Sequence, residues 1–289
     1  GEPGLSGEVI VAFQGVRGAY SEIALRQVFG ESAIPLPCPQ FRDVFEAVAS
    51  GRAAAGVLPL ENALAGPILD NYDLILKFPD LSLCGETYVR VNHHLIGIPG
   101  SRIEGIKRVF SHPQGLAQSA EFLDGHPDWE RVPFFDTAGS VEHVKSLGSP
   151  ENAAIASGIA AIIHGMQVLY QGTETDPKNF TRFGVMMRSD TRTLPSVGLE
   201  EGLKASVVFS LPHQPGSLLN CLQVIADQGL NLMKIESRPI PGRPWEYLFY
   251  LDVDTTIGLD RFFVTCKLLE GLTEHLRVTG LYPKGAIPT

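Results

Sequence analysis

The densest group of reactive side chains in the chain is the segment Asn179-Phe180-Thr181-Arg182-Phe183. It sets an amide, a hydroxyl and a guanidinium between two aromatic rings, so polar groups and apolar cover alternate along it. Small-molecule sites combine apolar walls with a few convergent polar groups in the same way. We therefore predict that this segment faces a bound ligand rather than a core.

Four further segments combine small residues with uncharged hydrogen-bonding side chains just after expected strands. They are residues 15–21, residues 61–63, residues 111–114 with Gln118, and residues 136–140. Ligands of open α/β sheets bind at the carboxyl ends of strands, so these loops are placed to share one cleft. Helix N-termini expected after Gly18, Pro113 and Ala138 would direct backbone N–H groups into it, which suits an anionic ligand.

Each of these loops also has a purely structural interpretation. Ser21, Ser111 and Thr137 could each cap a helix, and Asn62 could be an ordinary turn residue. Any one of them alone favours that interpretation. Their occurrence as a set favours a shared site.

The chain carries no recognisable motif for a cofactor or a metal. Gly15-x-x-Gly18 is too short for a dinucleotide fingerprint and lacks its third glycine. His93-His94 has no carboxylate or cysteine at ligand spacing, which favours a structural or surface role. We expect neither a cofactor nor a metal.

The composition describes a globular protein with little affinity for polyanions. The 289 residues are 44% hydrophobic and 19% charged, with a net charge of −9 at pH 7. That length suggests two or three folded units. The negative charge and the lack of a Lys/Arg run argue against nucleic acid as a partner, since phosphate binding needs clustered cations. A small molecule is the partner that we expect.

Two features bear on location. No segment of continuous apolar sequence is long enough to span a bilayer, so we expect no membrane partner. The four cysteines are far apart and form no CxxC pair, which is typical of reduced thiols in a reducing compartment. We predict a cytoplasmic protein. The chain does not begin with Met, so a removed targeting peptide, such as one for a plastid, stays an alternative.

Alternating strands and helices must position the polar loops up to about Met187. Strands are predicted over residues 9–13, 55–60, 94–98, 108–110 and 153–156, and helices from Ser21 toward Phe29 and from about Gly66 to Lys77. This alternation predicts an α/β layer structure with mainly parallel sheets.

A second unit is predicted after a linker over residues 189–204, which carry prolines and glycines without sustained periodicity. Its expected strands are 205–211, 231–238, 245–254 and 276–282, with a turn over 239–244. One helix is expected over 216–228, and another presents Phe262, Cys266, Leu269 and Leu272 on one face. The order βαββαβ fits a small ferredoxin-like sandwich.

Five motifs, in order along the chain, resemble those of the prephenate dehydratase family and its plant-type arogenate dehydratase relatives. They are Gly15-x-x-Gly18-Ala19-Tyr20-Ser21-Glu22, Pro59-Leu60-Glu61-Asn62, Ser111-His112-Pro113-Gln114, Asp136-Thr137-Ala138 and Asn179-Phe180-Thr181-Arg182-Phe183. Glu236-Ser237-Arg238-Pro239 is similar to the ESRP motif of that family's C-terminal ACT domain, a regulatory module that binds phenylalanine. The resemblance runs from about residue 9 to about residue 283.

The resemblance implies a two-lobed catalytic domain like a periplasmic-binding-protein pair over residues 8–188. Lobe 1 would comprise about 8–90 and 176–188, and lobe 2 about 91–175. A ferredoxin-like ACT domain would follow over 205–283. The Thr181 motif would then lie on the segment that returns to the first lobe, facing the cleft.

The resemblance also implies the chemistry, which is loss of a ring hydroxide and of carbon dioxide to give phenylpyruvate from prephenate or phenylalanine from arogenate. Thr181 would donate the proton, while Asn62, Ser111 and Gln118 would serve catalysis or binding. Ser21, Thr137, Ala138 and Phe183 would complete the pocket. Arg182 would either hold the surviving side-chain carboxylate or clamp its own loop. A non-catalytic binding protein stays a third alternative.

For the regulatory domain, the resemblance implies a phenylalanine site where two ACT domains meet, hence a homodimer or homotetramer under feedback inhibition. Its predicted residues are Pro215, Gly216, Ser217 and Leu218 at a glycine-rich turn and Glu236, Ser237 and Arg238 on a neighbouring strand. The chain departs from the family at Ala63, where a serine is usual, so a pocket wall would lack a hydroxyl. It also carries Ser217 in place of the commoner alanine.

Overall fold

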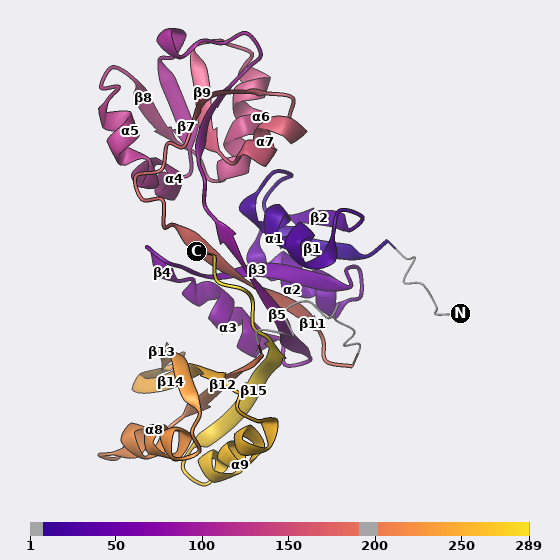
Figure 1. Ribbon diagram of the computed structural model, residues 1–289, viewed down its shortest axis with the longest axis vertical. Helices are drawn as coiled ribbons and strands as arrows, with labels where there is room; N and C mark the ends of the chain where they lie inside the picture. The colour runs from indigo at the N-terminus through magenta and orange to yellow at the C-terminus, as the bar shows by residue number, and fades with distance from the viewer. Residues whose placement is uncertain (1–7, 191–201, 289) are drawn as a thin grey trace. The chain divides into compact units, whose positions relative to one another are not determined.

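The computed structural model describes residues 8–190 and 202–288 (Figure 1). The chain divides into two compact units. The first contains the described residues up to Phe78 and Thr87–Gly184, and the second contains Pro79–Glu86 and Val185–Ile287. The predicted α/β class is confirmed. Most of the predicted linker lies outside the described residues, and the predicted domain bounds stay a prediction.

One sheet of the first unit has the strand order β11-β3-β1-β2. The central strand β1 (Ile10–Gln14) pairs in parallel with β2 (Ile34–Cys38) and with β3 (Ala55–Asn62). β11 (Phe180–Arg188) borders β3. The helices of this part are α1 (Tyr20–Phe29), α2 (Phe41–Ala49) and α3 (Leu69–Lys77). Their buried apolar faces cover the sheet, in which β3 and β11 are almost fully buried and the edge strand β2 is largely exposed or half-buried.

The helix predicted from Gly66 begins only at Leu69. Gly66–Pro67 instead forms the short strand β4, which pairs antiparallel with the end of β3 at Glu61 and Asn62. Gly66 has a φ of +87°, a left-handed conformation that glycine adopts without steric cost and that a helix cannot accommodate. This tight turn holds Asn62 at the carboxyl end of β3.

The other sheet of the first unit has the order β10-β6-β9-β7-β8. Its strands are β6 (His94–Gly97), β7 (Arg108–Ser111), β8 (Glu130–Pro133), β9 (Asn152–Ala156) and β10 (Gln167–Gln171). Its helical segments are η1 (Ile103–Gly105), α4 (Pro113–Gln118), α5 (Ala120–Asp124), α6 (Thr137–Leu147) and α7 (Gly158–Ile163). β9 is buried along its whole length because apolar clusters cover both faces of the sheet.

The prediction of mainly parallel strands is wrong for this sheet. β7 runs parallel to β8 and β9, but β6 runs antiparallel to β9 and to β10. Alternation of strands and helices fixes the direction of strands joined by crossover helices. It does not fix the direction of β6, which follows β5 (Leu81–Arg90) through a helix-free segment.

The second unit has the predicted order βαββαβ. It comprises β12 (Leu203–Ser210), α8 (Ser217–Asp227), β13 (Asn231–Ile240), β14 (Arg243–Asp254), α9 (Leu259–Glu270) and β15 (Glu274–Pro283). The antiparallel sheet has the order β13-β14-β12-β15, so β13 is an edge strand. The turn between β13 and β14 is shorter than predicted, because Gly242 has a φ of +78° and reverses the chain at once.

Within the second unit, the start of β5 adds to the edge of this sheet, where Leu83 pairs with Gly280. The pairing is close, because a Cβ on Gly280 would lie 2.4 Å from the carbonyl oxygen of Leu83. Lys204 and Glu86 form a buried ion pair beside it, with Nζ and Oε1 2.6 Å apart. No helix among residues 8–190 and 202–288 is long and apolar enough to cross a membrane.

Candidate active site

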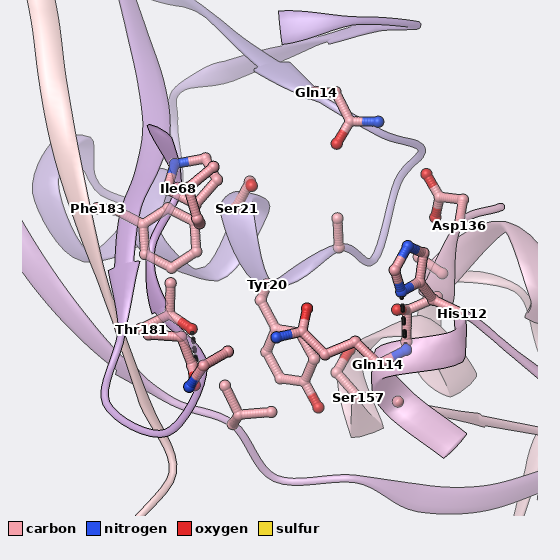
Figure 2. A pocket seen from close by; sticks show the side chains of 18 of the residues that line it. Gln14, Tyr20, Ser21, Ile68, His112, Gln114, Asp136, Ser157, Thr181 and Phe183 are labelled. Carbon is pink, nitrogen blue, oxygen red and sulfur yellow. Dashed lines mark hydrogen bonds between the residues drawn. The ribbon is translucent and has the colours of Figure 1, made fainter. Parts of the chain in front are cut away.

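A cavity of about 770 Å³ in the first unit receives loops that follow strands of both its sheets (Figure 2). Seven of the nine residues predicted for catalysis or substrate binding line it. They are Ser21, Asn62, Gln118, Thr137, Ala138, Thr181 and Phe183. In Figure 2, Thr181 and Phe183 lie on one side of the cavity, and His112, Gln114 and Asp136 lie on the other. The two sheets therefore contribute opposite walls.

The Thr181 hydroxyl is held by Asn62, and the direction of that hydrogen bond is fixed. Asn62 Oδ1 accepts from the backbone N–H groups of Leu64 and Ala65, each at 2.9 Å. Its Nδ2 must therefore be the end that faces Thr181 Oγ1, 3.1 Å away. Nδ2 can only donate, so Thr181 Oγ1 accepts, and its own proton remains to be donated elsewhere. Thr181 lines the cavity, so a ligand there can take that proton.

Asn179 supports this pair from behind the wall. Its side chain is fully buried, and its Oδ1 accepts from Asn62 Nδ2 at 2.7 Å. Its backbone carbonyl accepts from Val91 N at 2.7 Å, which joins the start of β11 to the end of β5. Asn179 does not line the cavity, so it orients the residues that do.

Arg182 faces away from the cavity. Side chains alternate across a strand, so Thr181 and Phe183 share one face of β11 and Arg182 takes the other. The guanidinium is 2% exposed, with Nε donating to Glu61 Oε1 at 2.7 Å and Nη2 to the Tyr72 hydroxyl at 3.2 Å. These contacts match the clamp among its two predicted roles, and Arg182 does not line the cavity; the carboxylate contact stays a prediction.

Ser111 also lies behind the cavity wall rather than on it. Its side chain is fully buried, and its Oγ donates to the carbonyl oxygen of Ile155 at 2.8 Å. A Cβ on Gly115, which lines the cavity, would lie 2.5 Å from this Oγ. Ser111 therefore joins β7 to β9 and supports the backbone of α4.

The capping interpretation of the polar loops is wrong for the residues named. α6 is capped by Asp136, whose Oδ1 accepts from Gly139 N at 2.8 Å, and not by Thr137. α4 is capped by His112, whose Nδ1 accepts from Gln114 N at 3.1 Å. Ser21 lies inside α1 and turns its hydroxyl to the cavity. Ala63 is exposed and does not line the cavity, so its missing hydroxyl removes nothing from the wall.

The glycine at position 18 is explained by a close contact: the loop after β1 packs there against the start of α7. A Cβ on Gly18 would lie 2.6 Å from Ala160 Cα, and its φ of +95° is left-handed. Ser157 Oγ donates to the Gly18 carbonyl at 2.8 Å, and His164 Nε2 donates to the Arg17 carbonyl at 2.8 Å. Only glycine allows this close approach of the loop to α7.

Tyr20 and His93 line the cavity but were not predicted as site residues. His93 Nδ1 lies 3.0 Å from the Tyr20 hydroxyl, and Nε2 lies 2.8 Å from Gln118 Oε1. Loss of water around His93 lowers its pKa, more than the Gln118 hydrogen bond and Glu174 raise it. Desolvation, and then Glu174, raise the pKa of Tyr20. The pair His93-His94 was the available signal, but sequence spacing alone could not show a partner distant in the chain.

The cavity carries negative rather than positive charge. Its described lining residues include two carboxylates, Asp70 and Asp136, and neither Lys nor Arg. Within residues 8–190 and 202–288, no group of three or more His, Cys, Asp or Glu side chains could hold a metal ion. Binding of an anionic group here depends on neutral donors, such as side-chain amides, hydroxyls and backbone N–H groups.

The predicted regulatory residues of the second unit fall in two places. Ser217 and Leu218 line a cavity of about 190 Å³, beside Trp245 and Tyr247. Pro215 and Gly216 are exposed at the turn before α8. Glu236, Ser237 and Arg238 lie on the edge strand β13 and do not line that cavity.

Comparisons with known proteins agree on one family. The chain matches the prephenate dehydratase family model over residues 11–191. Arogenate dehydratase/prephenate dehydratase 1, a chloroplastic protein of Arabidopsis thaliana, is 37% identical over 290 residues, covering 96% of this chain and 72% of that protein.

Two solved structures are similar to nearly the whole chain. Prephenate dehydratase from Arthrobacter aurescens in complex with L-Phe has a TM-score of 0.84 and 31% identity, covering 95% of this chain and 90% of that chain. GqqA, described as a novel type of quorum quenching acylase, has a TM-score of 0.84 and 33% identity, covering 95% of this chain and 98% of that chain.

Proposed function

The chain belongs to the prephenate dehydratase family, and from that membership we propose that it converts prephenate into phenylpyruvate by a decarboxylating dehydration. The observation that carries the proposal furthest is the hydrogen bond from Asn62 to Thr181, which leaves the threonine proton available to the cavity. The chain would act in the biosynthesis of phenylalanine, in keeping with the names of its relatives.

In this reaction two bonds break on opposite sides of one ring. The bond from C1 of the ring to its carboxylate breaks, and its electron pair enters the ring as carbon dioxide leaves. The bond from C4 to the hydroxyl oxygen breaks, and that oxygen leaves with the displaced pair and one added proton, as water. The ring becomes aromatic, which supplies the driving force.

Thr181 is the group placed to assist the departing oxygen. A hydroxyl that already accepts from Asn62 has its proton directed away from Asn62, into the cavity. Donating that proton stabilises the charge that develops on the leaving oxygen, and fixed donors of this kind are worth about 10²- to 10³-fold in rate. Phe183 adds an apolar wall to the cavity.

The leaving carboxylate needs neutral surroundings. A cation on it would stabilise the ground-state charge that must be lost, and so would slow the reaction. The described lining contains neither Lys nor Arg, and Arg182 is directed to Glu61 instead. Gln118, Ser21 and Thr137 are uncharged groups that can bind oxygen atoms of the substrate without this cost.

The proposal is tested with Thr181→Val, which keeps the shape of the side chain and removes its hydroxyl. Purified protein is supplied with prephenate, and phenylpyruvate is quantified. We expect kcat to fall by about 10²- to 10³-fold, whereas Thr181→Ser, the matched control, should retain most of it. Near-normal turnover by Thr181→Val would remove Thr181 from the mechanism. No turnover by well-folded wild-type protein would end the enzyme assignment, and hydrolysis of an acyl amide in its place would favour the activity described for GqqA.

A second candidate, arogenate dehydration, is favoured by one specific observation. Arogenate carries an ammonium group where prephenate carries a keto group, and its side chain is para to the hydroxyl. A ring with its hydroxyl at Thr181 directs the side chain to the opposite wall, where Asp136 lies (Figure 2). A carboxylate there would stabilise an ammonium group.

Asp136→Asn separates the two substrates, because asparagine preserves the helix cap and removes the charge. If Asp136 binds the ammonium group, kcat/KM for arogenate should fall about tenfold, as expected for one charged hydrogen bond, relative to that for prephenate. Asp70→Asn at the exposed start of α3 is the control, because it removes the other carboxylate of the cavity lining. Equal changes for both substrates would leave prephenate as the preferred substrate.

We further propose that residues 205–283 form an ACT domain that binds phenylalanine and inhibits the enzyme. The βαββαβ order of the second unit and the phenylalanine-bound relative support this. The predicted residues are divided between the turn before α8 and the edge strand β13, as expected if a second copy completes the site. A site shared in this way implies a homodimer or homotetramer. We also propose that the protein acts in the cytoplasm, or in a plastid.

A further inference from the structure

An exposed aromatic ring belongs to the wall of the cavity that the loops of the sheet β10-β6-β9-β7-β8 form. Phe135 follows β8 and precedes α6, and it lines the cavity although it is 81% exposed. A single exposed phenylalanine needs no explanation by itself, because folded proteins keep much apolar surface in water. Two further observations distinguish Phe135: other rings hold it in place, and the rest of its wall is polar or small.

A column of rings supports Phe135 from the core of this sheet. Its ring stacks on that of Phe134, with centroids 4.5 Å apart and an interplanar angle of 26°. Phe134 stacks in turn on His143 of α6 at 4.9 Å, and His143 contacts the buried Phe110 of β7 edge-on at 5.1 Å. The backbone is fixed as well, because Phe134 N donates to the Ser111 carbonyl at 2.8 Å. A side chain that is held in this way loses little further freedom when a ligand binds to it.

Phe135 also supplies a surface that its wall otherwise lacks. Among the described lining residues between β6 and β10, it is the one large apolar side chain, and the others are polar residues, Gly115 and Ala138. On the other side of the cavity, Phe183 and Ile68 provide apolar surface (Figure 2). A ligand ring that packs against Phe183 can therefore meet a large apolar side chain of the facing wall only at Phe135.

We propose that Phe135 is a specificity-determining residue, which packs against the six-membered ring of the substrate and covers the face turned away from Phe183. The ring is the apolar part of the substrate, and covering it removes apolar surface from water. The phenyl ring of the product makes the same contact, to which the attraction between aromatic rings adds. Phe135 thus selects acids that carry a ring. The inference rests on the proposed function and names a determinant of the substrate class that the cavity binds.

Phe135→Ala tests this contact by kinetics. An interaction that is equally strong in the bound substrate and in the transition state changes KM and leaves kcat unchanged. We expect KM for prephenate to rise about tenfold while kcat stays within about twofold of wild type. Phe135→Leu keeps apolar cover and should stay within about threefold in KM. An unchanged KM in Phe135→Ala would overturn the inference, as would a loss confined to kcat.

Ile162→Ala is the matched control. Ile162 is also 81% exposed, but it lies on α7 and does not line the cavity. Its replacement removes a similar exposed apolar group, so KM should stay at the wild-type value. A rise as large as in Phe135→Ala would overturn the inference, because loss of exposed apolar surface in general would then explain both. Thermal melting shows whether each variant is folded at the assay temperature.

A double-mutant cycle tests whether the column of rings positions Phe135. Phe134→Ala removes the ring on which Phe135 stacks, and should raise KM for prephenate about threefold, as for one lost aromatic pair. In the Phe135→Ala background the same change should alter KM by less than about twofold, because no ring is left to position. Equal effects in both backgrounds would mean that Phe134 supports the fold instead, and would overturn positioning by the column.

Binding of phenylpyruvate, measured by isothermal titration calorimetry, separates this inference from the proposed function. Phe135→Ala should weaken binding about tenfold relative to wild type. Equal affinities would overturn the ring contact, whether or not prephenate is converted. Absence of prephenate turnover, together with phenylpyruvate binding that depends on Phe135, would instead remove the proposed function and keep the contact. Wild-type protein that neither converts prephenate nor binds phenylpyruvate would overturn both.

Discussion

The cavity of the first unit and the candidate effector surface of the second unit are built in different ways. Seven predicted residues meet in the first, and a fixed hydrogen-bond network supports them. In the second, the predicted residues are divided between an exposed turn and an edge strand. Met233 and Ile235 on that strand are 39% and 42% exposed. A reaction site can be completed by one chain, whereas an effector site shared between copies stays open in each.

The largest expected effect is at Asn62, because its substitution can remove the hydrogen-bond donor that orients Thr181 in the cavity of the first unit. Asn62→Asp keeps Oδ1 for the turn at Leu64 and Ala65 but replaces the Nδ2 donor with an acceptor. The Thr181 proton would then turn to the added carboxylate oxygen instead of the cavity. We expect kcat for prephenate to fall by about 10²- to 10³-fold while the protein stays folded, measured by steady-state kinetics and thermal melting. Turnover close to that of wild type would mean that the first site does not depend on this network.

The next largest effect compares Arg182 and Thr181, adjacent residues on β11 that should affect stability and turnover separately. Arg182→Met removes the buried clamp to Glu61 and Tyr72, and should lower the free energy of unfolding by about 2 kcal/mol, as expected for charged hydrogen bonds. Thr181→Val should leave that free energy nearly unchanged while lowering kcat by about 10²- to 10³-fold. Denaturant titration measures the first quantity, and kinetics below the melting temperature measure the second. If folded Arg182→Met lost prephenate binding, the guanidinium would have to contact the substrate after all.

A smaller effect is expected in the second unit, without loss of the first site. Gly216 has a φ of +83° and open space around it, so Gly216→Ala adds a side chain where the proposed effector would approach. Inhibition by phenylalanine should weaken about tenfold, equivalent to roughly 1.4 kcal/mol, while turnover without phenylalanine stays unchanged. Gly229→Ala, at the other end of α8 with a φ of +75°, is a control for backbone strain. Equal inhibition in wild type and Gly216→Ala would separate this turn from regulation.

The smallest effect is a pH dependence of stability that belongs to the first unit. Burial lowers the pKa of His93 below its ordinary value of 6.5, so the unfolded chain binds more protons than the folded one as the pH falls through that value. The contribution is present in full above the unfolded pKa and is lost toward the folded pKa. The melting temperature should therefore fall as the pH is lowered below about 6.5, and less steeply in His93→Gln. Identical slopes would show that other groups carry the dependence.

Much of this organisation could be predicted from the sequence. The βαββαβ order followed from apolar periodicity, and the loops after β1, β3 and β7 were placed in one cleft because strand ends converge. The different roles of Thr181 and Arg182 could also be predicted, because adjacent residues of a strand point to opposite faces of the sheet. Treating the segment around them as a loop concealed that alternation.

The remaining parts depended on contacts between distant segments. His93 and Tyr20 are 73 positions apart, and His93 and Gln118 are 25 apart, so no local pattern could join them. The antiparallel direction of β6 was hidden for a similar reason, because pairing partners and not propensity decide how a strand runs.

The sequence by itself determined the fold class, the family, and the uncharged groups available to surround Thr181, because these follow from side-chain type and spacing. Only the tertiary structure decided which of those groups reach the cavity. It set Ser111 and Arg182 behind the wall and brought His93 against Gln118. The physical reason is that hydrogen-bond direction and burial depend on where atoms from separate segments meet, and spacing along one segment does not specify that meeting.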